Sequence, residues 1–206
     1  INLLNENLIG KITLYATSEQ GYKNLTKLSS KSYLNNKMNH DPHCDVNDLI
    51  LNNEDLILLT GNYNDFFGKL FYANKTKNFE KIITKLKSSF KDRLYIEIQR
   101  HGESLEENYE NYLLKLSSLH DIPIIAGQEV FYLDSTMVEA HDALICIGEK
   151  SFVDDNSRIK FSDQHYIKES SELKKLFIDI PEALENNYNF PFRFSFKPKK
   201  SNPILP

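Results

Sequence analysis

The hydrophobic and polar positions of residues 94–127 predict a strand, a helix and a second strand in succession. Residues 95–99 alternate bulky apolar and polar side chains, which is typical of a strand. Four apolar side chains then recur at helical spacing, namely Tyr109, Tyr112, Leu113 and Leu116. A continuous apolar run follows at residues 122–127, as a strand covered on both faces requires. Residues 94–127 are therefore predicted to form a βαβ unit.

The ends of this unit carry its candidate chemistry. We expect Ser104 to cap the helix, because Glu107 follows three residues later and can complete a capping box. In sheets and barrels built from βαβ units, ligands bind beyond the carboxyl ends of the strands. His101, Gln128 and Glu129 follow the two predicted strands, so we expect these side chains at that edge.

Hydrophobic spacing predicts further elements on both sides of the unit. Strands are expected at residues 11–16, 56–61 and 165–168. Helices are expected at residues 18–34, 45–51, 65–73, 79–90, 135–148, 171–178 and 181–187. The first of these helices should bury Tyr22, Leu25, Leu28 and Tyr33, and Gly148 should end the helix that begins at residue 135. Because strands alternate with helices, the sequence predicts an α/β fold with a mainly parallel sheet.

Composition and charge narrow the classes of function. A formal net charge of -4 argues against a chain whose main work is to bind a phosphate backbone, and Lys197, Lys199 and Lys200 form its dense basic cluster. Cys44 and Cys146 show no pairing pattern, and the chain shows no secretory signal, so we expect a cytoplasmic protein without disulfides. No apolar run approaches the roughly 20 residues that span a bilayer.

Other candidate sites are interpreted as structural. The stretch at residues 40–45 contains two histidines and a cysteine, but a structural zinc needs a second ligand pair, so we interpret it as a loop. His141 is predicted to be a core histidine on an apolar helix face. The aromatic stretches at 66–67 and 190–196 are either a contact surface or buried within the chain. Motifs of nucleophilic catalysis and Gly-rich phosphate loops do not occur.

Several motifs, in collinear order, are similar to those of one family. They lie at residues 21–33, 95–102, 124–132 with 139–148, 179–186 and 202–206. Together they resemble the PHP (polymerase and histidinol phosphatase) domain of the alpha subunit of bacterial DNA polymerase III. The resemblance implies part of a distorted (β/α)7 PHP-type barrel, with the PHP domain at residues 1–190 and a linker toward the polymerase module at 191–206. It also implies that the family's first histidine ligands would precede Ile1, so we expect an internal piece of a longer protein.

The resemblance also implies a function for the whole subunit, which is template-directed DNA synthesis with magnesium in the polymerase module. The PHP domain would support the polymerase and dock the proofreading exonuclease and other polymerase III holoenzyme subunits. DNA would be bound through the rest of the subunit, and no membrane is implied. We expect this segment to be a non-catalytic scaffold with no cofactor and no catalytic residues of its own.

Three positions decide between a scaffold and an enzyme. In metal-binding members of the family, the histidine that corresponds to His101 is a metal ligand. Glu129 stands where the family has an aspartate, and Phe131 replaces a histidine and has no lone pair to donate. His101 and Glu129 are therefore interpreted as vestigial metal positions. The alternative is an active phosphoesterase or 3′–5′ exonuclease that uses zinc or manganese, with His101 and Glu129 as surviving ligands.

Overall fold

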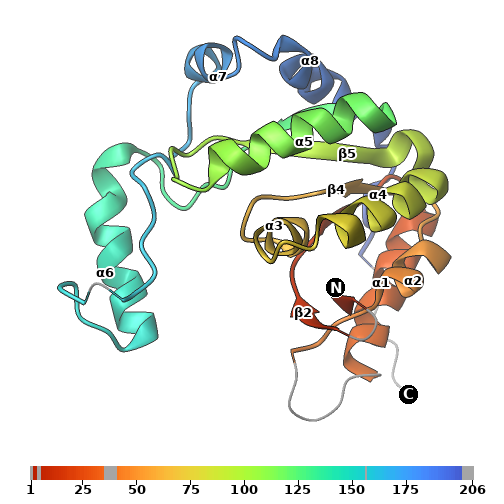
Figure 1. The fold of residues 1–206 in the computed structure, drawn as a ribbon, viewed down its shortest axis with the longest axis horizontal. Helices are drawn as coiled ribbons and strands as arrows, with labels where there is room; N and C mark the ends of the chain where they lie inside the picture. The colour runs from red at the N-terminus through yellow and green to blue at the C-terminus, as the bar shows by residue number, and fades with distance from the viewer. Residues whose placement is uncertain (1, 4–5, 35–40, 156, 201–206) are drawn as a thin grey trace.

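The computed structural model describes residues 2–3, 6–34, 41–155 and 157–200. Its main sheet contains β3 (Thr13–Ala16), β4 (Leu56–Leu59), β5 (Leu94–Gln99) and β6 (Ile124–Gly127), in that order. Strands β4, β5 and β6 are parallel, and β3 runs antiparallel to β4. A separate pair of strands is formed by β1 (Asn2–Leu3) and β2 (Glu6–Ile9). The predicted class, an α/β fold with a mostly parallel sheet, is confirmed (Figure 1).

Helices alternate with these strands along the chain (Figure 1). They are α1 (Glu19–Leu34), α2 (Val46–Leu51), α3 (Phe66–Tyr72), α4 (Thr76–Phe90), α5 (Glu106–His120), α6 (Val138–Glu149), α7 (Ser170–Leu176) and α8 (Pro181–Asn189). The predicted βαβ unit is β5, α5 and β6, and β5 pairs with β6 in parallel from Ile96 opposite Ile124. This arrangement is consistent with part of a PHP-type barrel.

The two faces of the sheet bury different residues, because side chains alternate along each strand. One face packs against the helices and contributes Leu56, Leu58, Leu94, Ile96, Ile98 and Ile124 to the main core. Five apolar residues at helical spacing on α4 are buried there: Phe79, Ile82, Ile83, Leu86 and Phe90. The opposite face forms a smaller cluster of Ile57, Leu59, Tyr95 and Ile125, against which Phe190 and Phe194 pack.

The two aromatic stretches differ in burial: residues 66–67 are buried, whereas in 190–196 Phe190 and Phe194 are half-buried and Phe192 is 77% exposed. Phe66 and Phe67 belong to the main core and are fully buried. Phe190 meets the rings of Tyr15 and Tyr95 at centroid distances of 5.4 and 5.7 Å. The chain after residue 189 therefore packs on the sheet before it leaves the described residues, and the domain boundary at residue 190 stays a prediction.

Helix α1 buries only part of the face that its large side chains indicate, since Leu28 is buried and Leu25 packs against the main core as predicted. Tyr22 and Tyr33 are 49% and 69% exposed, whereas Gly21, Asn24 and Leu28 are buried. A Cβ on Gly21 would lie 2.2 Å from the carbonyl oxygen of Asp55, so the backbone approaches too closely for any larger residue. This close approach turns Tyr22 outward, and the prediction that Tyr22 and Tyr33 are buried was wrong.

Two predicted caps are also wrong. Helix α5 begins at Glu106 after Leu105, without a side-chain cap, and neither Ser104 nor Glu107 takes the predicted role. Helix α6 ends at Glu149, and its carboxyl-terminal cap is Lys150, which adopts the left-handed conformation with φ 54°, and not Gly148. The capping box at Asp45 of α2, in contrast, is present.

Helix α6 projects from the body of the molecule (Figure 1). Cys146 is its buried residue, and Leu144 and Ile147 are 65% and 76% exposed. His141 is only half-buried and stacks on Phe131, which corrects the prediction of a core position. Helix α6 therefore carries more apolar side chains than its neighbours bury.

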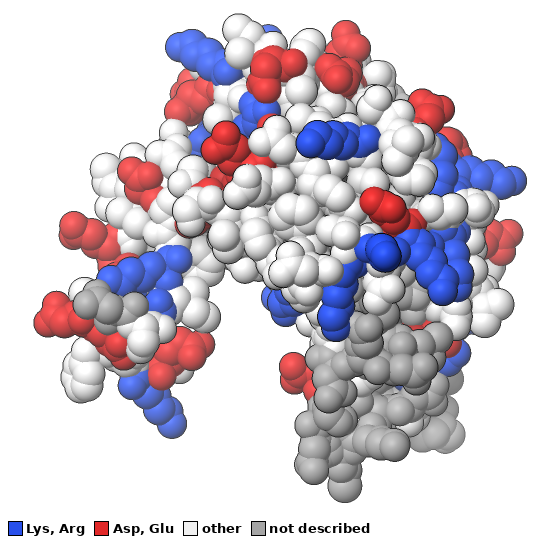
Figure 2. Space-filling view, in the orientation of Figure 1, with Lys and Arg blue, Asp and Glu red and all other residues white. Residues whose placement is uncertain are grey.

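A wide hollow separates the side of the molecule that carries α6 from the side that carries α1 and β2 (Figure 2). Within the described residues, no helix is both long and apolar enough to cross a bilayer.

The predicted strand at residues 165–168 is reduced to a single bridge between Tyr132 and Tyr166. In the stretch at 40–45, residue 40 lies outside the described residues, and Asp45 serves as the cap of α2.

Candidate functional site

The carboxyl edge of the parallel strands brings together the two candidate residues. His101 follows β5 and is 2% exposed, and Glu129 follows β6. The backbone N–H of Glu129 donates a hydrogen bond to Nε2 of His101 at 3.1 Å. The predicted placement of His101 and Glu129 at one edge is therefore confirmed, and the contact is between an imidazole and a backbone amide.

This contact selects the tautomer of the neutral His101 ring. Because Nε2 accepts a hydrogen bond, the proton of the neutral ring resides on Nδ1. Nδ1 then donates to Oε1 of Glu106 at 3.0 Å. Both ring nitrogens of His101 are thus engaged within the protein.

The carboxylate of Glu106 takes the place of a conventional helix cap. It accepts the backbone N–H of His101 at 2.7 Å and that of Glu103 at 3.1 Å. Burial by itself raises the pKa of Glu106, but the hydrogen bonds from His101 and Glu103 together lower it below the ordinary value. Glu106 is therefore an anion that holds the turn after β5 in place.

His165 completes this arrangement, and sequence reasoning missed it. Its ring stacks on His101 with centroids 4.1 Å apart and an angle of 1°. Nδ1 lies 3.1 Å from the carbonyl oxygen of Glu129, to which it donates. Burial, reinforced by the nearby His101, lowers the pKa of His165, so the ring is held neutral. The buried Nε2 has no hydrogen-bond partner among the described residues, and it lies 3.7 Å from Oε1 of Glu103.

Phe131 fills the space beside the two histidines. Its ring stacks on His165 and on His141, in both cases with centroids 5.0 Å apart. Phe161 closes the cluster at 4.7 Å from Phe131. A phenyl ring at this position supplies packing and no lone pair.

Three carboxyl groups with raised pKa values lie along the same edge: Asp65, Glu97 and Glu129. Burial is the main cause for each. Mutual repulsion adds to it, since Asp65 and Glu129 raise the pKa of Glu97 and Asp65 raises that of Glu129. Oε1 of Glu97 is 2.8 Å from Nε2 of Gln99, whose hydrogen bond opposes the shift. Glu97 and Asp65 were not singled out by the sequence, because both look like ordinary polar positions of a strand end and a helix cap.

Comparison with known proteins identifies the family of one part of the chain and its relatives over the whole. A model of the PHP domain matches residues 5–101. Residues 5–101 belong to the PHP domain family. It is 35% identical over 195 residues to DNA polymerase III subunit alpha of Caulobacter vibrioides, 32% over 197 residues to that of Vibrio cholerae and 35% over 199 residues to that of Rickettsia bellii.

These matches cover 95%, 95% and 97% of the chain, respectively. The chain spans 17% of the length of each of these relatives. The resemblance to DNA polymerase III alpha subunits is thus confirmed over nearly all of the chain, and the PHP domain model accounts for residues 5–101 of it. A segment of this length does not by itself account for the activities of the complete relatives.

The residues of this PHP domain do not fit a bound metal ion in the arrangement described. A metal at His101 would have to displace either the Glu129 N–H from Nε2 or the Glu106 carboxylate from Nδ1. In the described ranges, no three His, Cys, Asp or Glu side chains are grouped so that they could hold a metal ion. The nearby cavity lined by Asn62, Glu97, Gln99 and Glu106 measures about 10 Å³, which is room for one water at most.

Proposed function

We propose that this chain is the PHP domain of a bacterial DNA polymerase III alpha subunit and that it acts there as a non-catalytic scaffold. In this proposal the whole subunit carries out template-directed DNA synthesis with magnesium in its polymerase module. The PHP domain supports that module and docks the proofreading exonuclease. Similarity to alpha subunits over 95% or more of the chain supports the assignment to this subunit. The free thiols of Cys44 and Cys146 support a cytoplasmic location.

The hydrogen bond from Glu129 N–H to Nε2 of His101 is the observation that carries the scaffold role. A catalytic metal ligand needs a free lone pair directed at the ion, and this lone pair is directed at a backbone amide. Phe131 supports the same conclusion, since its ring packs on His165 where a histidine ligand would supply a lone pair.

Metal content and hydrolysis test this role. The purified alpha subunit and its His101→Ala variant should both contain far less than one equivalent of zinc or manganese by elemental analysis. Neither should hydrolyse a phosphodiester substrate when these metals are added. Stoichiometric metal in the parent protein that is lost in His101→Ala would contradict the scaffold role.

Docking is tested separately, by association of the alpha subunit with its exonuclease subunit. We expect co-elution on size-exclusion chromatography and loss of co-elution when the PHP domain is deleted. If the polymerase still bound the exonuclease after deletion of the PHP domain, the docking role would be contradicted. The result on metal content would not be affected.

A second function is favoured by one observation. The buried Nε2 of His165 has no partner in the described part of the chain, and it faces Glu103 at 3.7 Å. Such an orphaned lone pair suits a metal ligand of a phosphoesterase or 3′–5′ exonuclease. This alternative predicts metal-dependent hydrolysis that His165→Asn and His101→Ala both abolish. Inactivity of the parent protein with zinc, manganese or magnesium added would eliminate it.

A further inference from the structure

A groove of about 890 Å³ lies between the first turns of α1 and residues 195–199. Ala16, at the end of β3, pairs with Leu56, the first residue of β4. Helix α1 therefore starts at the amino edge of the parallel strands, whereas His101 lies at their carboxyl edge. The groove is a separate feature from the candidate site described above.

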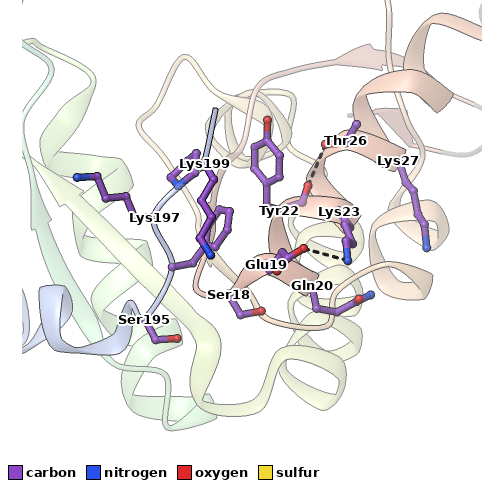
Figure 3. A pocket seen from close by; sticks show the side chains of 12 residues that line it. Ser18, Glu19, Gln20, Tyr22, Lys23, Thr26, Lys27, Ser195, Lys197 and Lys199 are labelled. Atoms are coloured by element: carbon purple, nitrogen blue, oxygen red, sulfur yellow. Dashed lines mark hydrogen bonds and ion pairs between the residues drawn. The ribbon is translucent and has the colours of Figure 1, made fainter. Parts of the chain in front are cut away.

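The walls of the groove are basic. Lys23 and Lys27 line the groove from α1, and Lys197 and Lys199 line it from the extended segment on the opposite side. Figure 3 shows Lys199 and the two α1 lysines on either side of Tyr22, with Lys197 extending away from α1. Glu19 is the acidic residue of the lining, and its carboxylate is paired with Lys23 at 3.2 Å. The groove thus concentrates positive charge on a chain whose formal net charge is -4.

An aromatic pair lies among these lysines. The rings of Tyr22 and Phe196 are 5.5 Å apart, at an angle of 33°. Tyr22 is 49% exposed, so much of its surface is open to a ligand. The close approach of Gly21 to Asp55 holds this tyrosine outward, so its exposure follows from the packing of α1.

The wall formed by residues 195–199 is anchored. The backbone N–H of Ser195 donates to the carbonyl oxygen of Thr17 at 3.0 Å. Phe194, just before it, packs on Tyr15 with ring centroids 6.0 Å apart. A groove whose walls are already in place requires little ordering when a ligand binds, which favours affinity.

We propose that this groove binds a single-stranded nucleic acid. Lys23, Lys27 and Lys199 contact its phosphates, and a base packs against Tyr22 and Phe196. Positive charge beside aromatic rings is the combination by which proteins bind single strands, because every base has a flat face. A duplex keeps those faces stacked inside, and an acidic peptide offers carboxylates without flat rings, so both fit the aromatic pair less well. The proposal depends on the groove alone and holds whether or not the His101 site is vestigial.

Site-specific cross-linking tests the proposal in the full-length protein. An oligodeoxythymidine in which one base is 5-iodouracil is irradiated with the protein, and the cross-linked peptides are identified by mass spectrometry. We expect cross-links at the peptides that contain Tyr22 or Phe196. The yield at these peptides, followed against DNA concentration, gives the affinity of this groove without interference from other DNA sites.

Variants then test the two parts of the interaction. A plot of log affinity against log salt has a negative slope. In the Lys23→Gln/Lys27→Gln double variant this slope should be less steep by about 1.4, because each phosphate of a single strand that is no longer neutralised reduces its magnitude by about 0.7. Tyr22→Ala should weaken binding by about 5- to 150-fold, as the removal of one stacking partner implies. The matched control is Lys81→Gln/Lys85→Gln on α4, which makes the same charge change at exposed positions outside the groove.

Three outcomes would overturn the proposal. The first is an absence of cross-links at both peptides, and the second is an equal effect of the groove and control variants. The third is equal competition by duplex DNA or by polyglutamate at the same salt, which would show simple charge attraction without use of the rings. Circular dichroism of each variant establishes that the fold is intact. None of these measurements depends on metal content or exonuclease binding, so failure here is distinct from failure of the scaffold proposal.

Discussion

Gly127 at the end of β6 lies directly against the carboxylate of Glu97 on β5. A Cβ built on Gly127 would come within 2.0 Å of Oε1 of Glu97. The absence of a side chain at one strand end therefore leaves room for a buried acid on its neighbour. This pairing shapes the carboxyl edge on which His101 and Glu129 lie.

Gly127→Ala should destabilise the protein by about 1–3 kcal/mol, because the added methyl group has to displace Glu97 in a packed sheet. Urea denaturation followed by circular dichroism measures the change. Gly148→Ala is the matched control, since a Cβ there meets nothing within 4 Å and Ala is the better helix former. The double variant Gly127→Ala/Glu97→Ala should be less destabilised than the sum of the single variants. Strict additivity would show that the two residues do not conflict.

Glu97→Gln should stabilise the protein at neutral pH. Burial raises the pKa of Glu97, so the folded state binds a proton more readily than the unfolded state does, and the ionised carboxylate costs stability at higher pH. The parent protein therefore gains stability relative to the variant as pH falls through the raised folded pKa toward the ordinary value of 4.5. Unfolding free energies of both proteins at pH 5 and pH 8 give the comparison. A larger advantage of the variant at pH 5 than at pH 8 would reverse the assigned direction, and Glu107→Gln at an exposed position serves as the control.

Arg100 should be needed to hold the segment that links α7 and α8 against the sheet. Its guanidinium donates to Oδ1 and Oδ2 of Asp179 at 2.7 and 2.8 Å, and its Nε donates to Oε2 of Glu110 at 3.0 Å. Arg100→Lys cannot reproduce these paired contacts and should cost about 2–3 kcal/mol, because Glu110 is left largely buried without its partner. Hydrogen exchange should rise in α7 and α8 while α4 stays protected. Equal exchange in both proteins would show that other contacts hold the segment.

Phe131→His should not by itself create a metal site. The new imidazole would lie beside His165, but the lone pair of His101 Nε2 would still be bound to the Glu129 N–H. Isothermal titration with zinc and with manganese should show no more stoichiometric binding than the parent protein does. Phe131→Leu controls for the loss of ring stacking. Tight binding of one metal equivalent by the histidine variant alone would show that the site needs only this one change.

The sequence predicted the parts of the site that depend on local pattern. The alternation at residues 95–99 and the apolar run at 122–127 each specify a strand, and parallel strands place their carboxyl ends at one edge. That rule is enough to bring His101 and Glu129 to the same edge of the sheet. Side-chain periodicity is a property of a single segment, so it can be read from that segment alone.

The contacts made by His165 and Phe131 could not be predicted in this way. His165 begins the stretch predicted as a strand at 165–168, but that pattern does not say what the ring contacts, and only the folded chain stacks it on His101. The groove depends on an even longer connection, since Ser195 meets Thr17 across 178 positions of sequence. The outward direction of Tyr22 follows from the backbone of Gly21 against Asp55, which outweighs the apolar spacing of α1.

The sequence by itself thus determined the class of fold, the order of its elements and the edge at which the candidate residues meet. Only the tertiary structure decided which lone pairs of His101 are occupied and which lysines face one another across a groove. The physical reason is the range of each effect. Hydrophobic periodicity acts within a few turns or strand residues, whereas hydrogen bonds and ring stacking act between segments that folding alone brings within a few ångströms of each other.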